Sequence, residues 1–328
     1  MSEHARPTAG GEFDLIAWIA ARVAETARTP AALLGIGDDC AILRAPASRA
    51  LLVSTDMLLD GRHFVLGRDG PEAAGRKAIA ANISDIAAMA GLPLAAVVAV
   101  ALPRQDTFSL GQKILEGMIE PALRFGVALV GGDTTAWDGP LALSVTILGE
   151  TTARGAVRRT GARPGDAVVV TGPLGGSILG RHLRPEPRVF EAISLHQRAD
   201  IHAMIDITDG FVADLGHLLE ARSDAVAGTS RGPLGADLDA SRIPIHDDAR
   251  RLAAQTGRAP LNHALHDGED FELCLALDPA DLASIRAADP ALPLFYVGEI
   301  SGEPGIRLRR DDGTTVALEP HGFDHFKF

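Results

Sequence analysis

Aspartates in short segments after apolar runs are the residues of this chain best suited to chemistry. They stand beside glycine, amide or hydroxyl residues in Gly37-Asp38-Asp39, Ser54-Thr55-Asp56, Asn82-Ile83-Ser84-Asp85, Gly131-Gly132-Asp133-Thr134-Thr135 and Asp206-Ile207-Thr208-Asp209-Gly210. Two carboxylates about 5 Å apart repel by roughly 3 kcal/mol at an effective dielectric of about 20, so convergent aspartates require divalent cations. Hard oxygen ligands without nearby cysteine or histidine favour magnesium or calcium over zinc.

Any one of these aspartates has a structural explanation, because aspartate caps helices and begins turns. Repetition of the same pattern after several apolar runs weakens that explanation. A carboxylate beside a hydroxyl is what a magnesium-phosphate site requires. Acids that bind magnesium, in a chain without an activated nucleophile, indicate phosphoryl transfer between two bound groups.

Other chemistries find little support in the sequence. The segment Val168–Gly176 runs from an apolar stretch into glycines, but it lacks the Gly-x-Gly-x-x-Gly order of a dinucleotide loop. No segment matches the phosphate-binding P-loop or the Gly-x-Ser-x-Gly nucleophile elbow. Because the histidines are scattered and the two cysteines, Cys40 and Cys274, are far apart, we expect neither covalent catalysis nor a thiolate metal site.

Composition limits the partners of the chain. The 31 lysines and arginines face 43 acids, which gives a net charge of −12, and no basic stretch could follow a nucleic-acid backbone. No run reaches the roughly 18 apolar residues that a membrane span needs, and the segment Met1–Gly10 is polar. We therefore expect a cytoplasmic protein that binds neither nucleic acid nor membrane.

The length of 328 residues and the order of the elements predict two α/β domains with mixed sheets. The composition changes near Gly149–Asp166, which predicts an N-terminal domain of residues 1–150 and a C-terminal domain of residues 151–328. Apolar patterning predicts helices over Glu12–Ala27, Pro71–Met89, Phe108–Phe125 and Phe211–Ala221, and further helices beginning at Ser177 and Pro279. It predicts strands over Leu51–Ser54, Leu94–Leu102, Val127–Val130, Leu141–Leu148, Ala167–Thr171, Met204–Ile207, Phe271–Leu277 and Leu294–Val297.

An ordered set of segments from Gly11 to Phe326 resembles the thiamine-monophosphate kinase family. Besides the aspartate segments, the set contains Gly11-Glu12-Phe13, Arg159-Thr160-Gly161-Ala162-Arg163-Pro164-Gly165-Asp166, Gly268-Glu269-Asp270-Phe271-Glu272-Leu273 and Gly322-Phe323-Asp324-His325-Phe326. The resemblance implies an ATP-dependent kinase that converts thiamine phosphate to thiamine diphosphate with several Mg²⁺ ions. It also implies the superfamily of aminoimidazole ribonucleotide synthetase, and a homodimer in which the N-terminal domain pairs its sheet with a second subunit.

The resemblance further implies a role for individual residues. The implied magnesium ligands are Asp39, Ser54, Thr55, Asp56, Asp85, Asp133, Asp206 and Asp209. The implied nucleotide contacts are Gly132, Asp133, Arg159 and Thr208, and the implied thiamine phosphate contacts are His63, Glu269 and Phe323. Asp56, Asp133 and Arg159 are the expected catalytic residues, because they would neutralise the phosphates during in-line transfer.

Two alternatives remain open. Another ATP-dependent enzyme of the same superfamily could carry these aspartates, although Met1–Gly11 lacks the reactive Cys and the Lys of selenophosphate synthetase, and Gly268-Glu269-Asp270 disfavours an amidine-forming synthetase. A non-enzymatic module could instead use the acids to bind calcium between domains.

Overall fold

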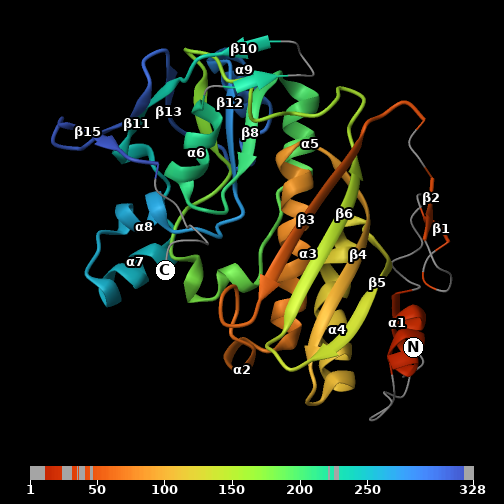
Figure 1. Ribbon diagram of the computed structural model, residues 1–328. Helices are drawn as coiled ribbons and strands as arrows, with labels where there is room; N and C mark the ends of the chain where they lie inside the picture. The colour runs from red at the N-terminus through yellow and green to blue at the C-terminus, as the bar shows by residue number, and fades with distance from the viewer. Residues whose placement is uncertain are drawn as a thin grey trace. The chain divides into compact units, whose positions relative to one another are not determined.

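The computed structural model describes residues 12–23, 32–34, 36, 41–44, 47–220, 222–224 and 229–320 (Figure 1). The chain forms two compact units. The first comprises Met1–Ile86 and Leu92–Thr151, and the second comprises Ala87–Gly91 and Thr152–Phe328. Each unit combines helices with a sheet that contains parallel and antiparallel strands, which confirms the predicted mixed α/β class.

A four-stranded sheet with the order β3-β6-β4-β5 forms the centre of the first unit. Its strands are β3 (Leu51–Leu59), β4 (Leu92–Pro103), β5 (Ala128–Trp137) and β6 (Ala142–Glu150). Strands β4 and β5 are parallel, and α4 (Thr107–Phe125) connects them, whereas the other neighbouring strands are antiparallel. A short antiparallel pair, β1 (Ala32–Leu34) and β2 (Ile42–Leu43), precedes the sheet.

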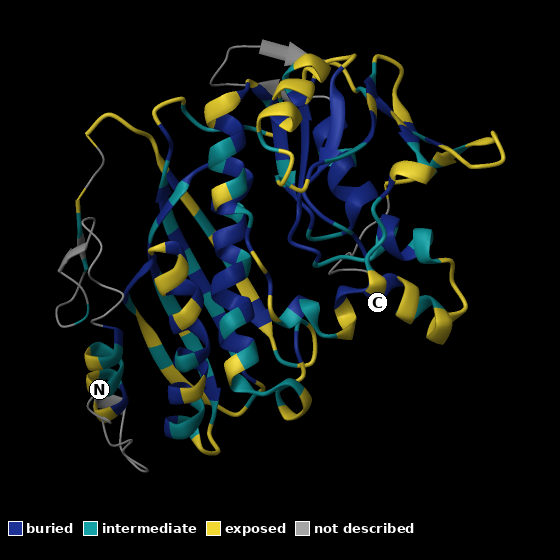
Figure 2. Ribbon diagram, turned by 180° about the vertical axis from the view of Figure 1, so that it is seen from behind, coloured by how far each residue is buried: buried dark blue, intermediate teal, exposed yellow. Residues whose placement is uncertain are grey.

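Two helices, α3 (Pro71–Ala88) and α4, cover one face of this sheet, as the opposite views of Figures 1 and 2 show. They approach each other through glycines. A Cβ atom on Gly75 would lie 1.9 Å from the carbonyl oxygen of Ile114, and one on Gly117 would lie 1.9 Å from that of Glu72. Helices α1 (Glu12–Val23) and α2 (Leu66–Asp69) complete the first unit.

The opposite face of this sheet exposes apolar side chains along β3. Strand residues alternate between faces, so the residues buried toward the helices, such as Leu52 and Leu58, alternate with Leu51, Val53 and Met57. These three side chains keep 51%, 62% and 61% of their surface exposed. Thr55 lies between Val53 and Met57 on this face, and exposed apolar side chains grouped along one strand are typical of interaction surfaces.

A seven-stranded sheet with the order β15-β14-β11-β13-β7-β12-β8 forms the second unit. Its strands are β7 (Ala167–Val170), β8 (Ile201–Asp206), β11 (Gly235–Asp239), β12 (Leu273–Leu277), β13 (Phe295–Ser301), β14 (Gly305–Arg309) and β15 (Thr315–Leu318). Its helices are α5 (Val189–Arg198), α6 (Phe211–Leu219), α7 (Asp247–Thr256), α8 (Pro260–His266) and α9 (Pro279–Ala288). The pair β9 (Arg222–Asp224) and β10 (Thr229–Arg231) stands apart from this sheet.

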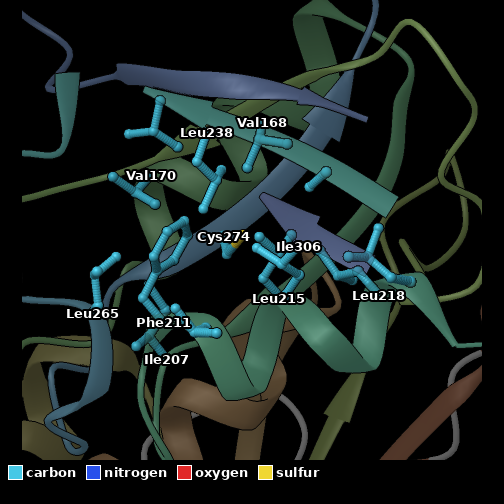
Figure 3. Close-up of a cluster of buried hydrophobic side chains, with 14 of the residues drawn as sticks. Val168, Val170, Ile207, Phe211, Leu215, Leu218, Leu238, Leu265, Cys274 and Ile306 are labelled. Atoms are coloured by element: carbon cyan, nitrogen blue, oxygen red, sulfur yellow. The ribbon is translucent and has the colours of Figure 1, made fainter. Parts of the chain in front are cut away.

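Two hydrophobic cores lie on the two faces of the seven-stranded sheet. Val168, Val170 and Cys274 face the core that contains Phe211 and Leu215 of α6 (Figure 3). The alternate strand residues face the other core, which α5 and α9 cover with side chains such as Leu195 and Leu282. Both central strands, β7 and β12, are therefore buried on each face, which explains their uninterrupted apolar sequences.

Several predicted elements differ in extent. Strand β3 continues to Leu59 and β5 continues to Trp137, so Asp56 and Asp133 lie within strands rather than after them. The helix predicted from Ser177 is wrong. Short 3-10 helices occupy Ser177–Leu179 and Arg181–Leu183, and α5 begins only at Val189, because Gly176 and Gly180 adopt φ values of 74° and 129° that interrupt a helix.

Within the part of the chain that the structure describes, helices are too short or too polar to cross a lipid bilayer. Location in the cytoplasm stays a prediction from the sequence.

The glycine contact between α3 and α4 predicts that Gly117→Ala destabilises the fold. A methyl group there must displace the Glu72 backbone, and we expect a loss of roughly 1–3 kcal/mol and a lower Tm, measured by chemical and thermal denaturation. Alanine favours an isolated helix over glycine by about 1 kcal/mol, so a stable variant would contradict the contact. Gly67→Ala is the control, because a Cβ atom at that position would meet no neighbouring group within 4 Å.

Candidate functional site

Strand β3 and helix α3 bring two predicted metal ligands into contact. The Ser54 hydroxyl donates a 2.5 Å hydrogen bond to Oδ2 of Asp85, across 31 residues of sequence. Both side chains are half-buried, Ser54 on the helix-covered face of the sheet and Asp85 on α3. A carboxylate and a hydroxyl from different elements thus lie in contact, and both are oxygen donors of the kind that magnesium binds; their role as metal ligands stays a prediction.

Asp56 points to the same face of β3 as Ser54, because the two residues are two positions apart. Its carboxylate is half-buried, and burial raises the pKa of Asp56 above its ordinary value. Thr55 points to the opposite face, where its hydroxyl donates to the carbonyl oxygen of Val145 at 3.1 Å and lies 2.9 Å from the Thr146 hydroxyl. The Thr55 hydroxyl is therefore already engaged on the face opposite Asp56.

Asp133 does not lie beside Asp56. Across the sheet, Asp56 of β3 lies opposite Val145 of β6, which lies opposite Val98 of β4, and Val98 lies opposite Gly132 of β5. Asp133 is the next residue of β5, so its side chain points to the other face of the sheet. Strands β3 and β5 are the two edges of the sheet, and three strand spacings separate them by roughly 14 Å. One ion cannot contact both carboxylates of a single chain.

Gly132 has a structural requirement of its own. A Cβ atom at this position would lie 2.0 Å from the carbonyl oxygen of Val98 on β4, so only glycine allows the two strands to pair here. The Gly-Gly-Asp segment is therefore explained in part by sheet packing. The exposed Asp133 that follows has no such explanation.

His63 lies in a tight turn after β3. Its Nδ1 atom accepts a 3.0 Å hydrogen bond from the backbone N–H of Leu59, which assigns the proton of the neutral ring to Nε2. Lys77 on α3 is 1% exposed, and its ammonium group donates to the carbonyl oxygen of His63 at 2.6 Å. A buried lysine thus fixes the backbone of a predicted substrate residue.

In the second unit, the turn after β8 is built around a buried carboxylate. Oδ2 of Asp214 accepts the backbone N–H groups of Thr208, Asp209 and Gly210 at 2.9, 3.0 and 3.2 Å. Burial raises the pKa of Asp214 to about 8, and the negative charges of Asp209 and Asp206 add to that rise. The predicted ligand Asp209 therefore lies in a turn whose backbone the Asp214 side chain holds, and Asp206 is the last residue of the strand before it.

The predicted substrate segment pairs with this turn. The backbone N–H of Glu269 donates to the carbonyl oxygen of Thr208 at 2.8 Å, and that of Phe271 donates to the carbonyl oxygen of Ile207 at 2.9 Å. These bonds extend the antiparallel pairing of β8 with β12, in which Leu273 lies opposite Asp206. A predicted nucleotide residue and a predicted substrate residue are thus joined by one backbone hydrogen bond.

The remaining predicted residues are less constrained. Arg159 belongs to the second unit and its side chain is exposed. Asp39 and Phe323 lie outside the described residues. Among the residues whose placement the structure gives, no three acids, histidines or cysteines lie close enough together to hold one metal ion. Within the individual units, the structure brings Ser54 to Asp85 and Thr208 to Glu269, and in the first unit it keeps Asp56 and Asp133 on different edge strands.

Sequence reasoning missed three residues that shape these positions: Lys77, Asp214 and Asp270. Each has a buried ionisable side chain, which is costly to bury unless the group is hydrogen-bonded. Burial raises the pKa of Asp270 to about 7, although the Arg181 guanidinium opposes that rise. Only Asp214 had a signal in the sequence, because it is a charged residue among apolar and small neighbours in Val212-Ala213-Asp214-Leu215.

Comparison with known proteins shows a matching family model and similar curated sequences. Residues 37–151 match the family model of the AIR synthase related protein, N-terminal domain. The chain is 41% identical to a thiamine-monophosphate kinase of Rhodopirellula baltica, over 92% of this chain and 93% of that protein.

Solved structures of thiamine-monophosphate kinases are also similar to this chain. A crystal structure of thiamine-monophosphate kinase from Stenotrophomonas maltophilia K279a matches with a TM-score of 0.75 and 32% identity, over 92% of this chain and 97% of that chain. A structure of AaThiL complexed with AMPPCP and TMP matches with a TM-score of 0.72 and 30% identity, over 99% of this chain and 100% of that chain.

The hydrogen bonds to Asp214 predict that Asp214→Ala loosens the turn after β8. Three backbone N–H groups lose their acceptor, each at a cost of roughly 1–3 kcal/mol where water does not replace it. We expect hydrogen exchange at Thr208, Asp209 and Gly210 to accelerate by about tenfold or more, measured by mass spectrometry or NMR. Asp278→Ala, which removes a single acceptor at the start of α9, should change exchange only near Ala280. Unchanged exchange at all three amides would refute this role of Asp214.

Proposed function

The chain belongs to the thiamine-monophosphate kinase family, and on that premise we propose that it transfers the γ-phosphoryl group of ATP to the phosphate of thiamine monophosphate. The product is thiamine diphosphate. The structural observation that best supports this proposal is the hydrogen bond from Glu269 N–H to the Thr208 carbonyl, because it joins the segments of the expected substrate and nucleotide residues. The relative AaThiL was solved with AMPPCP and TMP together, which supports the same pair of ligands here.

Magnesium fits the donor set of the predicted site. The available groups are carboxylate and hydroxyl oxygens, the ligands that hard cations prefer, with Ser54 and Asp85 already in contact. Burial disfavours the charged form of Asp56, and a nearby cation would offset that effect. Bound magnesium would neutralise phosphate charge. Because Asp133 lies on the other edge strand, it would hold a different ion from Asp56 of the same chain.

Direct transfer needs no general base from the protein. The acceptor is a phosphate monoester with a second pKa of about 6, so at neutral pH its oxygen is already largely anionic. This oxygen attacks the γ-phosphorus in line, and the bond from the γ-phosphorus to the bridging oxygen of ADP breaks. The task of the protein is to hold two polyanions together, and the exposed guanidinium of Arg159 suits binding of phosphate oxygens.

A homodimer is the assembly that the first unit supports best. Leu51, Val53 and Met57 form an exposed apolar row on one sheet face, and a second copy of the same face would bury it. We therefore propose that this face of β3 is the dimer interface.

The alternatives to the kinase are a non-enzymatic module that binds calcium and an enzyme that uses ATP with a different acceptor.

Asp56→Asn is expected to abolish most activity while the fold persists. Loss of a metal-binding charge removes several kcal/mol of transition-state stabilisation, so kcat/KM should fall by roughly 10³-fold or more. ADP release with magnesium, ATP and thiamine monophosphate measures this change, and circular dichroism checks the fold.

The matched control is Asp138→Asn, because Asp138 is an exposed carboxylate of the same unit that pairs with the exposed Arg104. Activity of Asp56→Asn within tenfold of wild type would refute the assignment. Turnover with unphosphorylated thiamine would refute the acceptor, and calorimetry that detects calcium but neither AMPPCP nor thiamine monophosphate would favour the binding module.

Val53→Asp is expected to weaken the dimer. A charge in the middle of the exposed row would have to be buried without a partner on association, so the dissociation constant should rise by about tenfold or more. Sedimentation velocity across a concentration series measures this change. Leu123→Asp, at a 47% exposed position on α4, is the control and should leave association unchanged. A wild-type monomer, or an unaltered dimer of the Val53 variant, would exclude this interface.

A further inference from the structure

The segment around Glu269 has an unusual backbone. Glu269 and Phe271 adopt φ values of 61° and 53°, in the left-handed region that residues other than glycine rarely enter. Each such residue costs on the order of 1 kcal/mol and persists only where its surroundings enforce it. Two of them flank Asp270, so strong interactions must hold this short segment in place.

Asp270 supplies those interactions. Its side chain has no exposed surface, and its two carboxylate oxygens accept the backbone N–H of Gly175 at 3.0 and 2.9 Å. The Arg181 guanidinium donates to Oδ1 of Asp270 at 2.8 Å and to the Gly175 carbonyl at 2.9 Å. The buried Asp270 carboxylate and the half-buried Arg181 thus fix the segment between the two strained residues to the loop after β7.

Further bonds connect the same loop to the residues just before Glu269. The Ser177 hydroxyl donates to the carbonyl oxygen of Gly268 at 2.6 Å, and Gly176 N–H donates to Oδ2 of Asp267 at 3.0 Å. Gly175 and Gly176 have φ values of 89° and 74°, and a Cβ on either would lie within 2.6 Å of backbone atoms of α8 or α7. The loop is therefore shaped by glycine to reach the substrate segment.

The turn on the other side of Glu269 has a separate support. Asp214 holds the backbone of Thr208, Asp209 and Gly210 through three hydrogen bonds that do not involve the loop after β7. A change at Asp270 should therefore displace Glu269 more than it displaces the turn that carries Thr208.

We propose that Asp270, paired with Arg181, is a positioning residue that sets the orientation of Glu269 and thereby the affinity for thiamine monophosphate. This role rests on the proposed function, in which Glu269 contacts that substrate. Asp270 itself is buried, so it acts through the backbone conformation of its neighbours. The pair holds Glu269 and Phe271 at left-handed φ values, and the backbone conformation of Glu269 sets the direction of its carboxylate.

A double-mutant cycle tests the proposal. Asp270→Asn keeps the shape of the side chain but turns an amide toward the Arg181 guanidinium. We expect the Kd for thiamine monophosphate, measured by calorimetry, to rise by about tenfold or more, and the Kd for AMPPCP to change by less than about twofold. Glu269→Gln should also raise the Kd for thiamine monophosphate. In the Glu269→Gln background, Asp270→Asn should then cause little further rise in this Kd, because the effects of coupled residues on binding are not additive.

A structural role without positioning gives a different result. Asp166→Asn is the matched control, since Asp166 is buried, accepts the Arg163 N–H and pairs with His202, at the opposite end of β7 from Gly175. This variant should lose thermal stability without a selective change in substrate affinity. Additive effects of Asp270→Asn and Glu269→Gln, or equal weakening of both ligands, would overturn the proposal.

A milder variant keeps the proposal testable if Asp270→Asn does not fold. Ser177→Ala removes only the side-chain hydrogen bond to the Gly268 carbonyl. It should raise the Kd for thiamine monophosphate several-fold in the wild-type background but not in the Glu269→Gln background. If wild-type protein binds no thiamine monophosphate, the proposed function fails. Binding that neither Asp270→Asn nor Ser177→Ala alters leaves that function intact and overturns the positioning role.

Discussion

Buried carboxylates that accept backbone N–H groups are the interaction on which the loops of the second unit depend. A buried acid without hydrogen-bond partners is costly in either protonation state, so each of these acids requires partners around it. Asp214 gathers three consecutive N–H groups, and Asp270 gathers a glycine N–H and a guanidinium. The loops adopt the shapes that satisfy these acids, and the more exposed Asp209 and Glu269 take their positions from those shapes.

The first unit positions its acids by rigid elements instead. Helices α3 and α4 approach so closely that glycine is required on both, which fixes how α3 lies over the sheet. Asp85, ten residues after Gly75 on the same helix, then meets Ser54 on β3 at 2.5 Å. The same helix thus carries both the close contact with α4 and the predicted ligand that meets β3.

The sequence predicted the elements more reliably than the positions of their acids. Uninterrupted apolar runs predicted the buried strands β7 and β12, and α3 was predicted from a segment bounded by Pro71 and Gly91. The apolar pattern ended β3 at Ser54, although Thr55–Leu59 continue the strand. It also could not separate Asp214 and Asp270, which organise loops, from acids free to bind a ligand, because that difference arises from burial in the tertiary structure.

A kinase that joins two phosphates must hold a nucleotide and an acceptor whose charges repel, so the backbone segments that carry the residues for the two ligands must stay side by side. In the second unit this requirement is met by backbone. Thr208 accepts the N–H of Glu269, and Ile207 accepts that of Phe271, so backbone hydrogen bonds hold the two segments side by side. Side-chain contacts alone would allow the segments to separate through rotamer changes. Antiparallel pairing continuous with β8 and β12 instead makes the distance between the two sets of residues a property of the sheet.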